Sequence, residues 1–181
     1  MPSIRTRVLS TLLCVLVATP ALAKGKKSTG HAASNKASAE KHSNWVERSD
    51  PKGFTIKLPG VAEEKRDEWS TSYAVPLAED AVKLHATINV EPLDELTPVK
   101  SLDKAVEAAI KNRPRGAPPP NVAEQREVPG GFLVVIGPDY DTYAVDVTRN
   151  GKELQLKAHC AGPSSHLNEL KAMCLSVKPT K

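Results

Sequence analysis

The stretch with the clearest potential for chemistry is KAHCAGPSSHLNELKAMC, residues 157–174. It contains two cysteines and two histidines: His159, Cys160, His166 and Cys174. These residue types can form a zinc site, a Cys–His catalytic pair or a disulfide bond. The choice between the three depends on the direction of each side chain, and therefore on the elements that carry them.

Cys160 and His159 are predicted to point to opposite sides of a strand. Cys160 continues an apolar series in which every second residue is apolar: Leu154, Leu156 and Ala158. Side chains alternate across a strand, so His159 faces the other way. This separation argues against a catalytic pair of the two and against a metal site that they share.

Cys174 is predicted to reach the same core from a helix. It follows Leu167 and Leu170 at the spacing i, i+3, i+7, which places all three on one helix face. Two serines are candidate N-caps of this helix, Ser164 and Ser165. We therefore predict a disulfide between Cys160 and Cys174, which close a loop of fifteen residues counting both. Such a loop contributes about 3 kcal/mol in the chain-entropy model.

Metal sites are the weaker interpretation. Zinc ligation by the two cysteines and two histidines would use suitable donors, but their spacing matches no standard pattern, and exported dithiols are usually oxidised. A cluster of aspartates suggests calcium, but it lacks the glycine and terminal glutamate of an EF-hand loop: Asp139, Asp141 and Asp146. We assign no metal ligand and expect no cofactor.

No catalytic residue can be assigned from short motifs. The sequence contains no G-x-S-x-G, no H-E-x-x-H, no phosphate-binding glycine loop and no dinucleotide fingerprint. His85 falls on the polar side of a predicted strand. A hydrolase with an acidic site stays open, because paired carboxylates leave no short signature.

The first 23 residues are typical of a secretory signal peptide. Arg5 and Arg7 precede an apolar run over residues 8–18, which is too short to span a bilayer, and cleavage is expected after Ala23. Cys14 follows a leucine, which argues against a lipoprotein signal. We therefore expect an exported protein, periplasmic or extracellular.

Charge divides the rest of the chain into a basic tail and one domain. The whole chain carries +4, residues 1–23 carry +2 and residues 24–44 carry +4, which leaves −2 for residues 45–181. The tail is rich in Lys, Ser, Ala and Gly, so we expect it to be flexible. The mildly acidic domain argues against nucleic-acid binding. Only the tail is suited to weak contact with an anionic surface.

The domain is predicted to mix strands with two helices. Residues 53–60 and 82–90 alternate between apolar and polar positions, and a further strand is expected near residues 69–75. Residues 101–113 show helical spacing with Ser101 as N-cap. The run GFLVVIG suits a strand that is buried on both faces.

A hairpin is predicted around Asn150-Gly151, a pair that suits a two-residue turn. Setting Arg149 opposite Lys152 pairs Val147 with Leu154 and places the apolar residues on one face.

The layout resembles the PsbP-like α/β/α sandwich over roughly residues 45–179. The resemblance rests on the opening GFTIKLPG, a middle helix at SLDKAVEAAI and a last helix that runs into CLSVKP. It implies an α+β fold in which an antiparallel sheet is flanked by helices. It also implies a non-enzymatic exported or accessory protein. No functional residues are carried over.

The sequence thus favours an exported, non-catalytic accessory or binding domain with an unidentified protein or small-molecule ligand, and we expect a monomer. Two alternatives stay open: a secreted hydrolase with an unmarked acidic site, and an envelope-adhering protein that uses its basic tail.

Overall fold

The computed structural model describes residues 45–77, 82–93, 98–113, 116 and 119–180. The predicted signal peptide and basic tail lie outside these residues. The elements, in chain order, are β1 (Val46–Asp50), β2 (Phe54–Leu58), β3 (Glu63–Arg66), β4 (Ser70–Pro76), β5 (Lys83–Pro92), α1 (Leu102–Lys111), β6 (Val122–Val128), β7 (Gly131–Asp139), β8 (Thr142–Asn150), β9 (Leu154–Pro163), the 3-10 turn η1 (Ser164–His166), α2 (Leu167–Leu175) and β10 (Lys178–Pro179).

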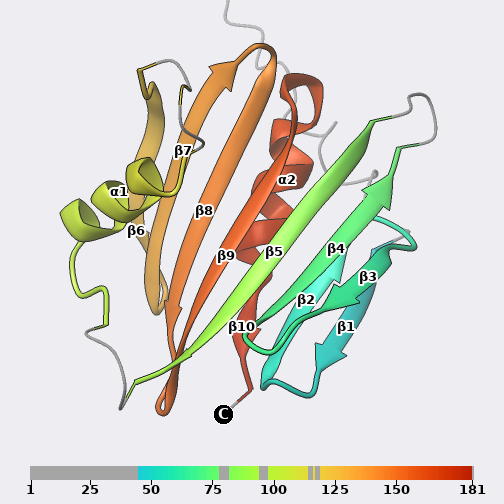
Figure 1. The fold of residues 1–181 in the computed structure, drawn as a ribbon, viewed down its shortest axis with the longest axis vertical. Coiled ribbons are helices and arrows are strands. Elements are labelled where there is room, and N and C mark those ends of the chain that lie inside the picture. Colours follow the sequence, from blue (N-terminus) through green and yellow to red (C-terminus); the bar gives the residue numbers. More distant parts are fainter. Residues whose placement is uncertain (1–44, 78–81, 94–97, 114–115, 117–118, 181) are drawn as a thin grey trace, which may run out of the picture. The chain divides into compact units, whose positions relative to one another are not determined.

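Two antiparallel sheets form the framework. The large sheet has the strand order β3-β4-β5-β9-β8-β7-β6, and the small sheet has the order β1-β2-β10. Helix α1 lies on one face of the large sheet, over β7 and β6, and α2 lies on the opposite face with the small sheet (Figure 1). This arrangement confirms the predicted α+β fold with an antiparallel sheet flanked by helices.

The main core lies between the large sheet, the small sheet and α2. Its β2 residues Phe54, Ile56 and Leu58 are fully buried, as their alternation predicts, and Leu84 and Ile88 of β5 are buried with them. Val82 was expected on the same inner side, but it precedes β5 and is 43% exposed.

A second, smaller core forms under α1. Ala105 and Ala109 pack on Phe132, Val134 and Ile136 of β7. The remaining apolar residues of β7 face the main core. The prediction of a strand buried on both faces is therefore correct, and the small alanine side chains allow α1 to lie close to it.

Ser101 begins α1 as predicted, because its hydroxyl oxygen accepts a hydrogen bond from the Lys104 backbone N–H at 3.4 Å. The predicted caps of α2 are wrong. Ser164 belongs to the preceding 3-10 turn, and its hydroxyl donates to Asp141 instead. The first residues of α2 have no side-chain cap.

The hairpin of β8 and β9 exists, but its predicted register is wrong. Val147 pairs with Ala158, four residues further along β9 than expected, and Asn150 pairs with Gln155. The loop therefore covers residues 151–153, and the Gly151 N–H donates to the carbonyl of Leu154, the first residue of β9, at 2.8 Å. Gln155 Nε2 also donates to Asn150 Oδ1 at 2.5 Å, which favours the wider loop. An even shift keeps every side chain on its predicted face.

Three strands were not predicted, namely β1, β3 and β6. All four residues of β3, and most of β6, are exposed or half-buried. Strands β3 and β6 are the edges of the large sheet, where charged side chains are common and hydrophobic alternation is weak.

Candidate functional site

Cys160 and Cys174 both lie in the main core, as predicted, and both are fully buried. The structure contains them as free thiols. Cys174 Sγ donates a hydrogen bond to the carbonyl of Val145 at 3.1 Å, and Val145 is the cross-strand partner of Cys160. Because both thiols are free in the structure, the disulfide between Cys160 and Cys174 stays a prediction.

The environment of the cysteines does not suit a nucleophile. Burial, and next the hydrogen bond with Cys160, raise the pKa of the Cys174 thiol well above its ordinary value. A thiolate is the reactive form of cysteine, and here its formation is disfavoured. A role for this thiol in catalysis thus has no support from its surroundings.

His159 lies on the opposite face of the sheet from Cys160, as the alternation predicts. Its ring nitrogen Nδ1 is 2.9 Å from Oδ1 of Asp146, and the hydrogen bond with Asp146 raises the pKa of His159. The sequence did not reveal this pair, because the predicted register sets Asp146 opposite Gln155. In the observed register Asp146 faces His159 directly.

A row of polar side chains extends from this pair across the outer face of the large sheet. Thr87 of β5 is the cross-strand partner of His159 on the side of β9 away from Asp146. Its hydroxyl lies 3.0 Å from that of Ser72. The order hydroxyl, imidazole, carboxylate resembles that of a catalytic triad. Within the described residues, however, no hydrogen bond joins either hydroxyl to the imidazole, so the row contains no activated nucleophile.

The other candidate residues lie apart from this row and from one another. Arg113 pairs with Asp139, and Ser164 binds Asp141. His166, at the end of η1, lies 4.0 Å from Glu169 of α2. Among the residues that the structure describes, no three His, Cys, Asp or Glu side chains are close enough to hold a metal ion.

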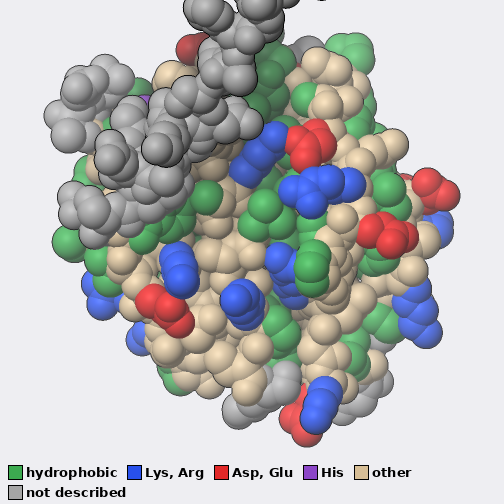
Figure 2. Space-filling view, turned by 180° about the vertical axis from the view of Figure 1, so that it is seen from behind, with side chains coloured by type: hydrophobic (Ala, Val, Ile, Leu, Met, Phe, Trp, Pro, Cys, Tyr) green, Lys and Arg blue, Asp and Glu red, His purple; other side chains and the backbone are tan. Residues whose placement is uncertain are grey.

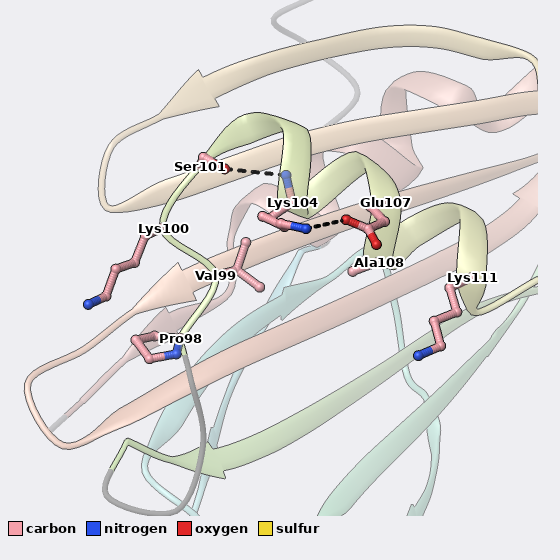
Figure 3. Close-up of a pocket in the computed structure, with 8 residues that line it drawn as sticks. All are labelled: Pro98, Val99, Lys100, Ser101, Lys104, Glu107, Ala108 and Lys111. Atoms are coloured by element: carbon pink, nitrogen blue, oxygen red, sulfur yellow. Dashed lines mark hydrogen bonds and ion pairs between the residues drawn. The ribbon is translucent and has the colours of Figure 1, made fainter.

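A hollow of about 430 Å³ lies between α1 and the segment that leads into it. Figure 3 shows that the segment and one side of the helix form its walls. Its lining residues are Pro98, Val99, Lys100, Ser101, Lys104, Glu107, Ala108 and Lys111. Sequence analysis did not find it, because the hollow depends on how the segment is held against the sheet. We call it the α1 hollow.

Two amides at the end of the β8–β9 hairpin hold this segment. Gln155 Oε1 accepts a hydrogen bond from the Val99 backbone N–H at 3.4 Å, and Asn150 Nδ2 donates to the Val99 carbonyl at 3.3 Å. Gln155 is itself only 2% exposed. Both backbone polar groups of Val99 are therefore satisfied, much as a neighbouring strand would satisfy them.

Lysines surround the α1 hollow. Lys104 Nζ lies 2.6 Å from Glu107 Oε2, and this contact raises the pKa of Lys104 and lowers the pKa of Glu107. Lys100 and Lys111 form no ion pair with any described residue. The hollow thus has three cationic side chains and one carboxylate, although the domain as a whole carries −2.

A second hollow, of about 520 Å³, lies at the other end of β5, β8 and β9. Tyr140, in the turn before β8, lines it and is 92% exposed, with His85 and Val82 across from it. Of the nearby charged groups, Lys83 forms an ion pair with Glu63, and Asp141 accepts a hydrogen bond from the Ser164 hydroxyl.

The face seen from behind the view of Figure 1 shows basic side chains mixed with acidic and apolar ones (Figure 2). They do not form the continuous basic field that typically marks nucleic-acid binding. Among the described residues, none of the helices has the length and apolar character needed to cross a bilayer.

No protein-family profile matches the sequence. No curated protein matches it either. Among solved structures, the chain is similar to the solution structure of cyanobacterial PsbP (CyanoP) from Synechocystis, with a TM-score of 0.53 over 75% of this chain and 92% of that chain. The chain has a PsbP-like fold. At 10% identity the likeness to PsbP extends to the fold alone.

Proposed function

We propose that this PsbP-like domain is an exported accessory protein that acts by binding through its surface and catalyses no reaction. The observation that carries the proposal is the separation of its reactive groups. Both cysteines are buried in the core, and the His159–Asp146 pair lies on an open face where no hydroxyl of the described residues bonds to the imidazole. A nucleophile in contact with its base is the usual requirement for covalent catalysis.

The surface offers hollows suited to binding. The wall of the α1 hollow is held in place, because its segment is tied to the β8–β9 hairpin through both backbone groups of Val99. A preformed hollow with a few polar groups around an apolar floor is a common type of ligand site.

Catalysis can be tested with His159→Ala and His166→Ala in the mature chain. We expect no turnover of ester, phosphoester, peptide or glycoside substrates that depends on either histidine. Stability should change by only about 0.5 kcal/mol, as for other surface substitutions. A turnover that is lost in His159→Ala or Asp146→Asn, with thermal stability preserved, would establish the rival hydrolase and overturn the proposal.

Export follows from the sequence of residues 1–23 and is tested by the N-terminal residue of the protein recovered from the cell envelope or medium. We expect that residue to be Lys24. A mature protein that begins at Met1 would contradict export. Affinity isolation from the native envelope with the tagged mature chain should then identify what the domain binds.

A further inference from the structure

We propose that the α1 hollow binds an anionic amphiphile, a small molecule with one apolar chain and a carboxylate or phosphate head. The inference rests on the proposed binding function and names the class of ligand. It is argued from the volume of the hollow, its apolar floor, its fixed wall and the charges around it.

The volume and lining suit a small organic molecule. A hollow of about 430 Å³ lies within the range of roughly 300 to 1,000 Å³ that is common for ligand sites. Pro98, Val99 and Ala108 provide apolar surface inside it. An inorganic anion would leave this surface uncovered, whereas an alkyl chain would remove it from water.

The wall of the hollow is fixed before any ligand arrives. The hydrogen bonds from Gln155 and Asn150 hold the backbone of Val99, and Gln155 is almost fully buried. On the other side, Ala105 and Ala109 anchor α1 to β7. Because this wall does not have to become ordered when a ligand binds, binding costs less conformational entropy.

The charges favour an anionic head. Lys104 and Glu107 neutralise one another, whereas Lys100 and Lys111 lie at opposite ends of the hollow, as Figure 3 shows. These two ammonium groups make the rim net positive in a domain that is net negative. Opposite charge attracts an anionic head to the rim while the chain lies on the floor.

The experiment is calorimetric titration of the mature chain with four probes. Dodecanoate and dodecyl phosphate carry both features of the ligand, dodecyl maltoside carries the chain without charge, and inorganic phosphate carries the charge without a chain. We expect the two amphiphilic anions to bind at least about tenfold more tightly than the other two probes, which is about 1.4 kcal/mol. Tighter binding of dodecanoate would indicate a free fatty acid as the ligand, and tighter binding of dodecyl phosphate would indicate a phosphorylated lipid.

Three variants and one control locate the binding. Lys100→Gln with Lys111→Gln should weaken binding of the amphiphilic anions about fivefold, since the two substitutions together remove two exposed charges opposite in sign to the head. Glu107→Gln should strengthen them about twofold to fivefold, because it removes a negative charge and releases Lys104. Ala108→Leu fills the hollow with a strong helix former and should weaken them at least about tenfold. Lys65→Gln on β3, an exposed lysine far along the chain from the hollow, is the matched control and should change nothing.

The predicted tail also contains five lysines that could attract an anionic probe. Binding of dodecanoate that is equal in all variants would place it outside the α1 hollow and overturn the proposal. Equal binding of inorganic phosphate and dodecyl phosphate would overturn the role of the apolar floor. Failure of every probe to bind would overturn this ligand class and leave the non-catalytic function intact, whereas only a histidine-dependent turnover would defeat that function. If Ala108→Leu does not fold, the opposite effects of the lysine and glutamate variants decide the question.

Discussion

His159 and Asp146 face one another across the ladder of β8 and β9, with Nδ1 and Oδ1 2.9 Å apart. The pair lies on the outer face of the large sheet, and about half of the imidazole side chain is exposed. It is the pair whose chemistry is most open to measurement, since histidine titrates near neutral pH.

The first prediction concerns the pKa of His159, which the hydrogen bond with Asp146 raises above its ordinary value of 6.5. A raised folded-state pKa means that the protonated ring stabilises the fold. This contribution is fully present below pH 6.5 and is lost as the pH rises through the higher folded-state pKa. NMR titration of Asp146→Asn should show the pKa of His159 falling relative to that in the unsubstituted chain. An unchanged pKa would mean that the two side chains do not interact in solution.

The error in the hairpin register shows what sequence patterns determine and what they leave open. Alternation assigned the faces of β2, β5 and β9 correctly, because the period of a strand is two residues. It did not fix the pairing, since a shift of four residues preserves every face. The Asn150–Gln155 contact, which accompanies the observed register, joins side chains on the two sides of the loop, and a rule based on the Asn-Gly pair alone does not include it.

The second prediction is the Cys160–Cys174 disulfide. In mature protein recovered from its native compartment, the intact mass should be about 2 Da below the fully reduced value, because the bond removes two hydrogens. Reduction should lower the free energy of unfolding by about 3 kcal/mol. Two thiols that alkylate without reductant in denatured, non-reduced protein would contradict it. Cys160→Ala is the control, because it cannot form the bond and its mass should be the same before and after reduction.

The third prediction concerns Arg149, which is buried and reaches two elements at once. Its guanidinium donates to the Pro129 carbonyl and, at 2.9 Å, to the Leu175 carbonyl at the end of α2. Arg149→Met should lower the free energy of unfolding by about 2 kcal/mol, since hydrogen bonds from charged groups contribute about 1.5 to 3 kcal/mol. Urea unfolding measures it. Arg48→Gln, at an exposed position of β1, is the control and should shift stability by only about 0.5 kcal/mol.

Gly131 gives the fourth prediction. A Cβ atom there would lie 1.7 Å from the backbone oxygen of Thr148, so Gly131→Ala must displace the start of the β7–β8 ladder. We expect a loss of about 3 kcal/mol in thermal or urea unfolding, at the upper end for overpacking. Gly60→Ala is the matched control, because its Cβ would meet only the Val75 side chain at 3.6 Å. Equal stability of the two variants would contradict this prediction and would show that β7 and β8 can move apart at Gly131 at little cost.

The sites were harder to predict than the elements. The sequence indicated the direction of His159, Cys160 and Cys174, which depends on local periodicity. It did not indicate the α1 hollow, because Val99 is held by side chains more than fifty residues away in the chain. The edge strands β3 and β6 were also missed, since their charged residues conceal the strand period.

The burial of β7 on both faces has a consequence for the solubility of the protein. Its run Phe132 to Ile136 contains five consecutive apolar residues, a composition that readily forms intermolecular sheets when it is uncovered. The short helix α1 covers one side of this run through Ala105, Ala109 and their neighbours. Helix α1 therefore also shields an aggregation-prone strand. Substitutions that weaken its packing are expected to lower the yield of soluble protein before they unfold the sheet.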